Sequence, residues 1–99
     1  MITEFVNFRA LETTADEQLF AKADIFINDF LKKQAGFVDA ELVKDTEGDA
    51  WCFILRYESF EKVKAIAEKM RNGKEFDAFK PVIVHGSIDV TFYQTLGKW

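Results

Sequence analysis

The chain has 99 residues, which is enough for one domain and too few for two. The formal net charge is −4, and Lys and Glu are scattered along the chain, so no basic stripe exists to follow a nucleic-acid backbone. No apolar run is long enough to span a bilayer. We therefore expect a single domain over residues 1–99 with neither a nucleic-acid nor a membrane partner.

The first strand is predicted at residues 2–11, where side chains of different character alternate. One side carries Ile2, Val6 and Phe8, and the other carries Phe5, Asn7, Arg9 and Leu11. A long amphipathic helix follows. Thr14 with Glu17 fits a capping box, and Gly36 can end the helix near Ala35. Its apolar stripe consists of Leu19, Ala23, Phe26, Ile27, Phe30 and Leu31.

Residues 37–44 and 50–57 predict two further strands that pair as a hairpin. The second of them is the central strand, because both of its faces are at least partly apolar. One face carries Trp51, Phe53, Leu55 and Tyr57, and the other carries Cys52, Ile54 and Arg56.

Ser59 is expected to cap a second helix, which Asn72 and Gly73 end. The apolar face of this helix consists of Phe60, Val63, Ile66, Ala67 and Met70. One further turn over residues 74–80 is stopped by Pro81. A last strand follows, with Ile88, Val90 and Phe92 alternating with polar residues.

This order predicts an α+β fold of the ferredoxin-like βαββαβ kind. It has a four-stranded antiparallel sheet, both helices on one face, and the first and third strands as the inner pair. Two helices cover only one sheet face, and an open face bearing apolar side chains would promote association with another protein surface. We therefore expect a homodimer in which two sheets pack face to face.

Three motifs carry a resemblance to a known family. They are the glycine-phenylalanine entry at residues 34–38, the junction at residues 55–60, and the segment at residues 75–79. With these the chain resembles the dimeric α+β barrel group, which includes antibiotic-biosynthesis monooxygenases and haem-degrading monooxygenases. The resemblance implies a dimeric α+β barrel and an activity of the monooxygenase type.

The haem-degrading branch uses an asparagine on strand one, a tryptophan at the end of strand three and a histidine on helix two. Asn7 matches the first, Tyr57 replaces the second, and Phe79 and Lys80 stand where the histidine is expected. The resemblance therefore argues against haem, and we expect no cofactor.

Three residues are candidates for catalysis: Asn7, Tyr57 and His85. His85 is the only histidine and could be a general base or a metal ligand, although the sequence favours a structural or solvated role. No second His or Cys stands near it in sequence, so we expect no metal site. Cys52, the only cysteine, is either a nucleophile or a small core residue. A lone cysteine and the lack of a recognisable leader predict a cytoplasmic location.

The sequence holds 11 Phe residues, and Phe builds cores and lines apolar pockets equally well. We expect a cavity between helices and sheet, with Asn7 and Arg9 at its polar end and Trp51 and Tyr57 on the matching face of the next strand. Alternatively, Arg9 reaches solvent or pairs with a carboxylate, Asn7 bonds a neighbouring loop, and the aromatic residues are plain core. The expected ligand-binding residues are Phe5, Asn7, Arg9, Phe26, Phe30, Phe53, Leu55, Tyr57, Phe60, Phe76 and Phe79.

Three classes of function remain open from the sequence. The first is a cofactor-independent monooxygenase acting on a hydrophobic substrate. The second is a binding protein for an apolar small molecule, either fatty-acid-like or aromatic. The third is a structural or regulatory dimer without catalytic activity. The pocket argument favours apolar ligand binding with oxygenase-type activity.

Overall fold

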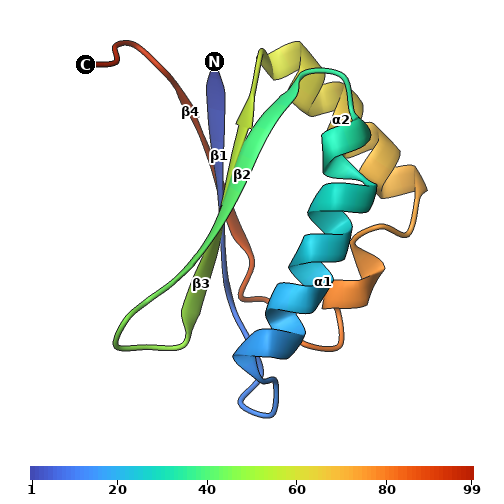
Figure 1. The fold of residues 1–99 in the computed structure, drawn as a ribbon, viewed down its shortest axis with the longest axis vertical. Coiled ribbons are helices and arrows are strands. Elements are labelled where there is room, and N and C mark those ends of the chain that lie inside the picture. Colours follow the sequence, from blue (N-terminus) through green and yellow to red (C-terminus); the bar gives the residue numbers. More distant parts are fainter.

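The computed structural model describes all residues from Met1 to Trp99 and has two layers, a sheet and a layer of helices (Figure 1). The helices cover one face of the sheet, and the other face is open. The elements follow one another as β1 (Ile2–Arg9), α1 (Asp16–Asp29), the 3-10 turn η1 (Leu31–Lys33), β2 (Phe37–Lys44), β3 (Ala50–Tyr57), α2 (Phe60–Asn72), the 3-10 turn η2 (Asp77–Phe79) and β4 (Asp89–Gln94).

The sheet has the strand order β2-β3-β1-β4, and every neighbouring pair is antiparallel. The predicted ferredoxin-like arrangement is therefore confirmed, including β1 and β3 as the inner pair. These two strands carry the strongest apolar rows of the sheet, and central strands are the ones that must be buried. Neither helix combines the length and the apolar character that a membrane-spanning segment requires.

Strand register decides which side chains share a face. Val6 pairs with Phe53, and Phe8 pairs with Trp51, and all four are buried beneath the helices. Because side chains alternate along a strand, the intervening residues of β1 and β3 point to the open face. These residues are Thr3, Phe5, Asn7, Arg9, Cys52, Ile54 and Arg56.

Helix α1 differs from its prediction at both ends. It begins at Asp16, and Ala15 occupies the cap position without a side-chain hydrogen bond. The expected capping box is wrong, because the amide of Thr14 is already bonded to the carbonyl of Leu11 in a turn that precedes the helix. At the other end the α-helix gives way to η1 after Asp29, and Gly36 then takes the expected positive φ, +89°.

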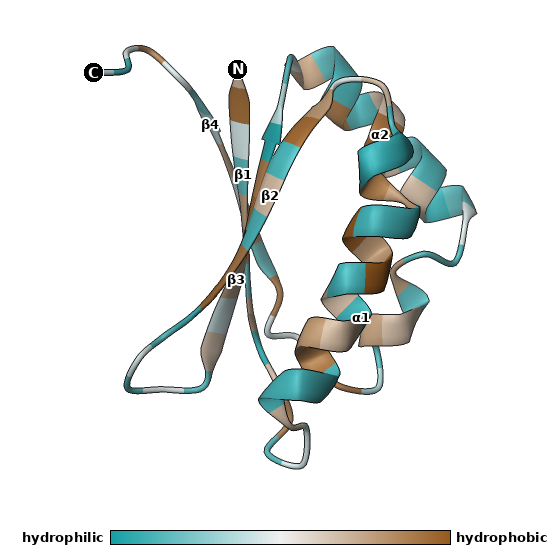
Figure 2. Ribbon diagram, in the orientation of Figure 1, coloured by the Kyte–Doolittle hydropathy of each residue, from teal (hydrophilic) through white to brown (hydrophobic).

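Ser59 caps helix α2 as predicted, because its Oγ accepts a hydrogen bond from the amide of Lys62 across 3.3 Å. Val63 and Ile66 are buried against the sheet, whereas Ala67 is exposed. Both helices carry hydrophobic and hydrophilic segments in alternation, as amphipathic helices do (Figure 2).

Strand β2 contains one extra residue, which produces a β-bulge. Phe37 pairs with Tyr57, but Asp39 already pairs with Arg56, so Val38 has no partner of its own. As a result Phe37 and Ala40 both face the helices. Asp39 lies on the open face, where its carboxylate pairs with the Arg56 guanidinium across 2.8 Å.

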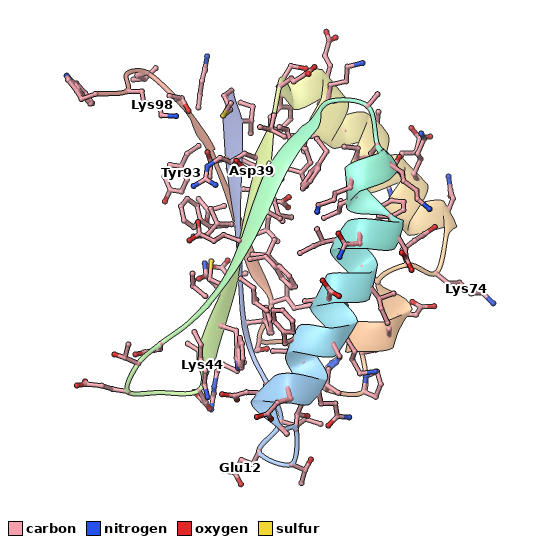
Figure 3. All side chains as sticks on the ribbon, in the orientation of Figure 1. Glu12, Asp39, Lys44, Lys74, Tyr93 and Lys98 are labelled. Atoms are coloured by element: carbon pink, nitrogen blue, oxygen red, sulfur yellow. The ribbon has the colours of Figure 1, made fainter.

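The core is a cluster of 16 buried residues, all of them hydrophobic, and it lies between the sheet and the helices (Figure 3). Its centre is aromatic. The ring of Phe26 lies 6.4 Å from that of Phe53 and 5.7 Å from that of Phe79, both in edge-to-face geometry. Phe53 and Phe79 are themselves perpendicular, with centroids 5.7 Å apart. These rings fill the interior by contacting one another.

Candidate functional site beside strand β4

The helical layer leaves part of β4 uncovered. Val90 pairs with Val6, and Phe92 pairs with Glu4, so both lie on the sheet face that the helices cover. Even so, Val90 is 42% exposed and Phe92 is 40% exposed. An apolar surface therefore remains open at this edge of the sheet.

Phe60, the first residue of α2, extends this surface. Its ring packs edge-to-face on Phe92 with centroids 5.4 Å apart, and 43% of the residue is exposed. We call Phe60, Val90 and Phe92 the β4 patch. Two rings in fixed contact and partly open to solvent can stack against a flat apolar molecule, because aromatic rings prefer offset or edge-to-face partners.

A polar pair lies next to the β4 patch. The Tyr57 hydroxyl donates a hydrogen bond to Oε1 of Glu4 across 3.0 Å, joining β3 to β1 on the helix-covered face. Tyr57 is 3% exposed, and Glu4 is half-buried. Since Glu4 pairs directly with Phe92, its side chain is a cross-strand neighbour of that ring.

Burial dominates the ionisation of this pair. It raises the pKa of Glu4 above its ordinary value, and the hydrogen bond from Tyr57 partly opposes that rise. Burial and the neighbouring carboxylate together raise the pKa of Tyr57 far above its ordinary value, so the phenol stays protonated and remains a donor. Glu4 therefore holds a carboxylate that is more basic than usual.

Only one oxygen of Glu4 is used within the chain. Tyr57 is the donor to Oε1, and no protein group donates to Oε2. Among the side-chain oxygens that are fully buried, only Oε2 of Glu75 lacks a hydrogen-bond partner. Because Oε2 of Glu4 also lacks a partner, it must be accessible to solvent. This leaves one acceptor available to a molecule bound at the β4 patch.

Reading the sequence missed Glu4. The inward row of β1 is Ile2, Glu4, Val6 and Phe8, in which one charged residue interrupts three apolar ones. That interruption was the available signal, since a carboxylate on a buried face is rare without a partner or a role.

The expected site residues on β1 lie on the open face. Asn7 pairs with Cys52, and neither faces the helices. Phe5, Asn7, Thr91 and Tyr93 line an open hollow of about 400 Å³, in which the rings of Phe5 and Tyr93 meet edge-to-face at 5.4 Å. Figure 3 shows Tyr93 on the side of the sheet away from the helices.

Arg9 is also separated from the aromatic core. Its Nη2 atom lies 2.9 Å from Oδ2 of Asp49, and both side chains are exposed. The guanidinium therefore holds the pKa of Asp49 below its ordinary value. This matches the alternative in which Arg9 reaches solvent and pairs with a carboxylate.

The remaining expected ligand residues lie on the helix-covered side. Buried in the core are Phe26, Phe30, Phe53, Leu55, Tyr57 and Phe79, with Phe76 packed against them. Phe60 alone is exposed, at the β4 patch.

The expectation of one cavity joining both groups is therefore wrong. A single-residue alternation puts Asn7 and Arg9 on the opposite sheet face from Trp51 and Tyr57, and the core rings pack on one another. Ligand binding by any of these residues stays a prediction.

His85 and Cys52 lie apart from the Glu4–Tyr57 pair. His85 is exposed and lines a hollow of about 340 Å³ with Ile83, Gly86 and other residues of the segment before β4. Cys52 is part-buried on the open face, where desolvation raises the pKa of its thiol and so disfavours the nucleophilic thiolate. No group of three or more His, Cys, Asp or Glu side chains is arranged to hold a metal ion.

No protein-family model matches the sequence, and no functionally described protein matches it significantly. Solved structures do match the fold. SnoaB, a cofactor-independent oxygenase from Streptomyces nogalater, superposes with a TM-score of 0.77 at 15% identity, covering 98% of this chain and 97% of its own.

Two further structures show the same similarity. A monooxygenase from the gene ActVA-Orf6 of Streptomyces coelicolor, solved with the ligand nanaomycin D, gives a TM-score of 0.81 at 17% identity, covering 99% of this chain and 89% of its own. Rv0793 from Mycobacterium tuberculosis gives 0.74 at 17% identity, covering 98% and 96%. The chain therefore has the ferredoxin-like α+β fold of the antibiotic-biosynthesis-monooxygenase-like proteins.

Proposed function

We propose that this protein binds a flat, apolar aromatic small molecule at the β4 patch and oxidises it with O₂ as a cofactor-independent monooxygenase. The observation that carries the proposal is the open aromatic surface of Phe60 and Phe92 directly beside the half-buried Glu4–Tyr57 pair. Small-molecule sites combine an apolar wall with a few directional polar groups in this way. The description of SnoaB as a cofactor-independent oxygenase supports the reaction class.

In such a reaction the substrate itself supplies the electrons. For a substrate whose reacting carbon is a CH₂ group, conversion to a carbonyl is a four-electron oxidation that reduces one O₂ completely. One oxygen atom enters the product and the other leaves as water. The protein contributes by holding substrate and O₂ together in a water-poor surrounding.

We further propose that the working form is a homodimer built through the open sheet face. That face carries the part-buried side chains of Phe5, Cys52 and Ile54. The protein has a single helical layer, which covers the opposite face of the sheet and leaves these side chains uncovered (Figure 1). Two such faces packed together would bury them in a symmetric interface. We also propose a cytoplasmic location, which the free thiol of Cys52 supports because a reducing compartment keeps thiols unpaired.

Native mass spectrometry of the protein as purified tests the proposed dimer and the proposed aromatic ligand together. Oxygen-uptake measurements with polycyclic aromatic substrates then test the proposed oxidation. The dimer mass, a retained aromatic molecule and stoichiometric O₂ consumption are the expected results. Phe92→Ala should weaken aromatic binding by roughly 2- to 10-fold, the value of one aromatic contact. Phe20→Ala is the matched control, because Phe20 is also an exposed phenylalanine but belongs to α1 and lies near Leu42 and Trp51 instead.

The filled interior favours a second candidate, a structural or regulatory dimer without activity. Phe53 and Phe79 are almost fully buried and pack on other rings, as plain core residues would. Dimer mass without any aromatic binding or oxygen uptake would select this second function and reject the first.

A further inference from the structure

We infer that Glu4 determines ligand specificity at the β4 patch: it selects aromatic molecules that present a hydroxyl group and rejects those that carry a carboxylate. The inference rests on the proposed function, since it assigns the ligand class of the same site. It follows from three observations on the position, bonding and accessibility of this one side chain.

The first observation is position. Glu4 and Phe92 are directly paired on adjacent antiparallel strands and point to the same sheet face. Side chains in such pairs have Cβ atoms about 4.5–5.5 Å apart. A planar molecule stacked on the exposed part of Phe92 therefore has its edge within reach of the Glu4 carboxylate.

The second observation is fixed orientation. The Tyr57 hydroxyl holds Oε1 of Glu4 across 3.0 Å, and Tyr57 is itself held by an edge-to-face contact with Phe37 at 5.9 Å. Because Tyr57 is buried and Phe37 is part-buried, the carboxylate cannot swing freely away from the patch. Tyr57 thus acts as a positioning residue for Glu4.

The third observation is an unused acceptor. No group in the chain donates to Oε2, and this atom keeps contact with solvent. A carboxylate is a strong acceptor of hydrogen bonds from hydroxyl groups. A second carboxylate placed at the same position would have no donor and would meet a like charge in a partly desolvated site.

No cation compensates the charge of Glu4. The guanidinium of Arg9 is bonded to Asp49, and that of Arg56 lies on the open face with Asp39. The ion pairs of the chain therefore leave Glu4 without a basic partner. This excludes the fatty-acid type of ligand from the β4 patch and leaves the hydroxylated aromatic type.

The test uses four probes that share one ring system: naphthalene, 2-naphthol, 2-methoxynaphthalene and 2-naphthoate. Their affinities for the purified protein are measured by calorimetry near neutral pH. We expect 2-naphthol to bind about 10-fold more tightly than 2-methoxynaphthalene, as one charge-assisted hydrogen bond provides. We expect 2-naphthoate to bind more weakly than naphthalene.

Glu4→Gln keeps the size of the side chain and removes its charge. It should reduce the preference for 2-naphthol over its methyl ether to about 3-fold or less, because a neutral acceptor is weaker. It should also restore 2-naphthoate binding to the level of naphthalene. Glu12→Gln removes an exposed carboxylate elsewhere and should leave all four affinities unchanged. Tyr57→Phe should lower the affinity for 2-naphthol while leaving naphthalene unaffected, as expected for a positioning role.

The possible failures are distinguishable. If naphthalene binds but the wild-type protein does not discriminate 2-naphthol from its ether, the specificity assignment is overturned and the aromatic site stands. Unchanged discrimination in Glu4→Gln overturns it in the same way. If no probe binds, the proposed aromatic site and this inference are both rejected. The wild-type comparison of the four probes decides the matter even if Glu4→Gln does not fold.

Discussion

Gly36 lies against the aliphatic stem of Lys62, so a side chain at position 36 would collide with the Cβ and Cγ atoms of that lysine. The same glycine has φ of +89°, and its carbonyl accepts a hydrogen bond from the amide of Glu58 across 2.8 Å. The turn before β2 is therefore fixed to the entry of α2 by a backbone that admits no Cβ atom.

The first prediction concerns this turn. Gly36→Ala should lower the free energy of unfolding by more than Gly86→Ala. Gly86 also has a positive φ, +79°, but a Cβ atom added there would meet nothing within 4 Å. The left-handed backbone alone costs about 1–2 kcal/mol for alanine. Urea unfolding of both variants measures the difference, and Lys62→Ala, which removes the colliding Cγ atom, should recover part of it. Equal costs for the two single variants would contradict the steric argument.

The second prediction tests the aromatic centre of the core. Phe79→Ala should destabilise the protein by about 3–5 kcal/mol, because Phe79 is fully buried and its removal leaves a cavity among three other rings. Phe20→Ala should change the unfolding midpoint little, since Phe20 is mostly exposed. Similar midpoints for the two variants would show that the rings are not packed as described.

The third prediction concerns the central strand. Leu55→Asp should prevent folding, because Leu55 is buried in β3 and an unpaired carboxylate there costs a large part of the total stability. Circular dichroism of the purified variant is the measurement. Leu96→Asp provides the control, since Leu96 follows β4 and is almost fully exposed. A Leu55→Asp protein that melts near the wild-type temperature would overturn the assignment of β3 as the buried centre of the sheet.

The fourth prediction concerns pH. Because the folded-state pKa of Glu4 is raised above its ordinary value of 4.5, protonated Glu4 stabilises the folded protein below that pH. This contribution is lost as the pH rises through the raised folded-state pKa. The stability of the wild type relative to Glu4→Gln should therefore fall as the pH rises from the ordinary value of 4.5 through the raised folded-state pKa. Urea unfolding of both proteins at a series of pH values measures it; a constant or rising difference would contradict the burial of this carboxylate.

Most of the architecture could be predicted because the apolar rows of β1 and β3 are long and regular. The apolar side chains in line with Phe8 on β1 and with Phe53 on β3 each had to face a core. The residues between them then had to point to the opposite sheet face, because side chains alternate along a strand. In the structure, this alternation and the observed register place Asn7 beside Cys52 on the other face. The expectation of Asn7 beside Trp51 failed because it set the faces of the two strands independently, although pairing makes them depend on each other.

The site beside β4 was harder to predict for two physical reasons. The exposure of Phe92 depends on how far the helical layer extends over the sheet, and helix packing is a tertiary property that the alternation of β4 does not contain. The hydrogen bond between Glu4 and Tyr57 joins residues 53 positions apart, which only the strand register brings together. The charged residue within the inward row of β1 was nevertheless visible in the sequence.

The bulge at Val38 divides β2 into two segments, and the alternation of inward and outward side chains shifts by one residue between them. Phe37 can point inward against Tyr57, while the acidic side chains further along can point outward to Arg56, and neither arrangement constrains the other. If Val38 were paired in a regular ladder, Phe37 and Asp39 would lie two positions apart and on the same face, so that either the aromatic contact or the ion pairs would have to be given up. One unpaired residue thus allows a single short strand to meet the demands of a core on one side and of a charged surface on the other.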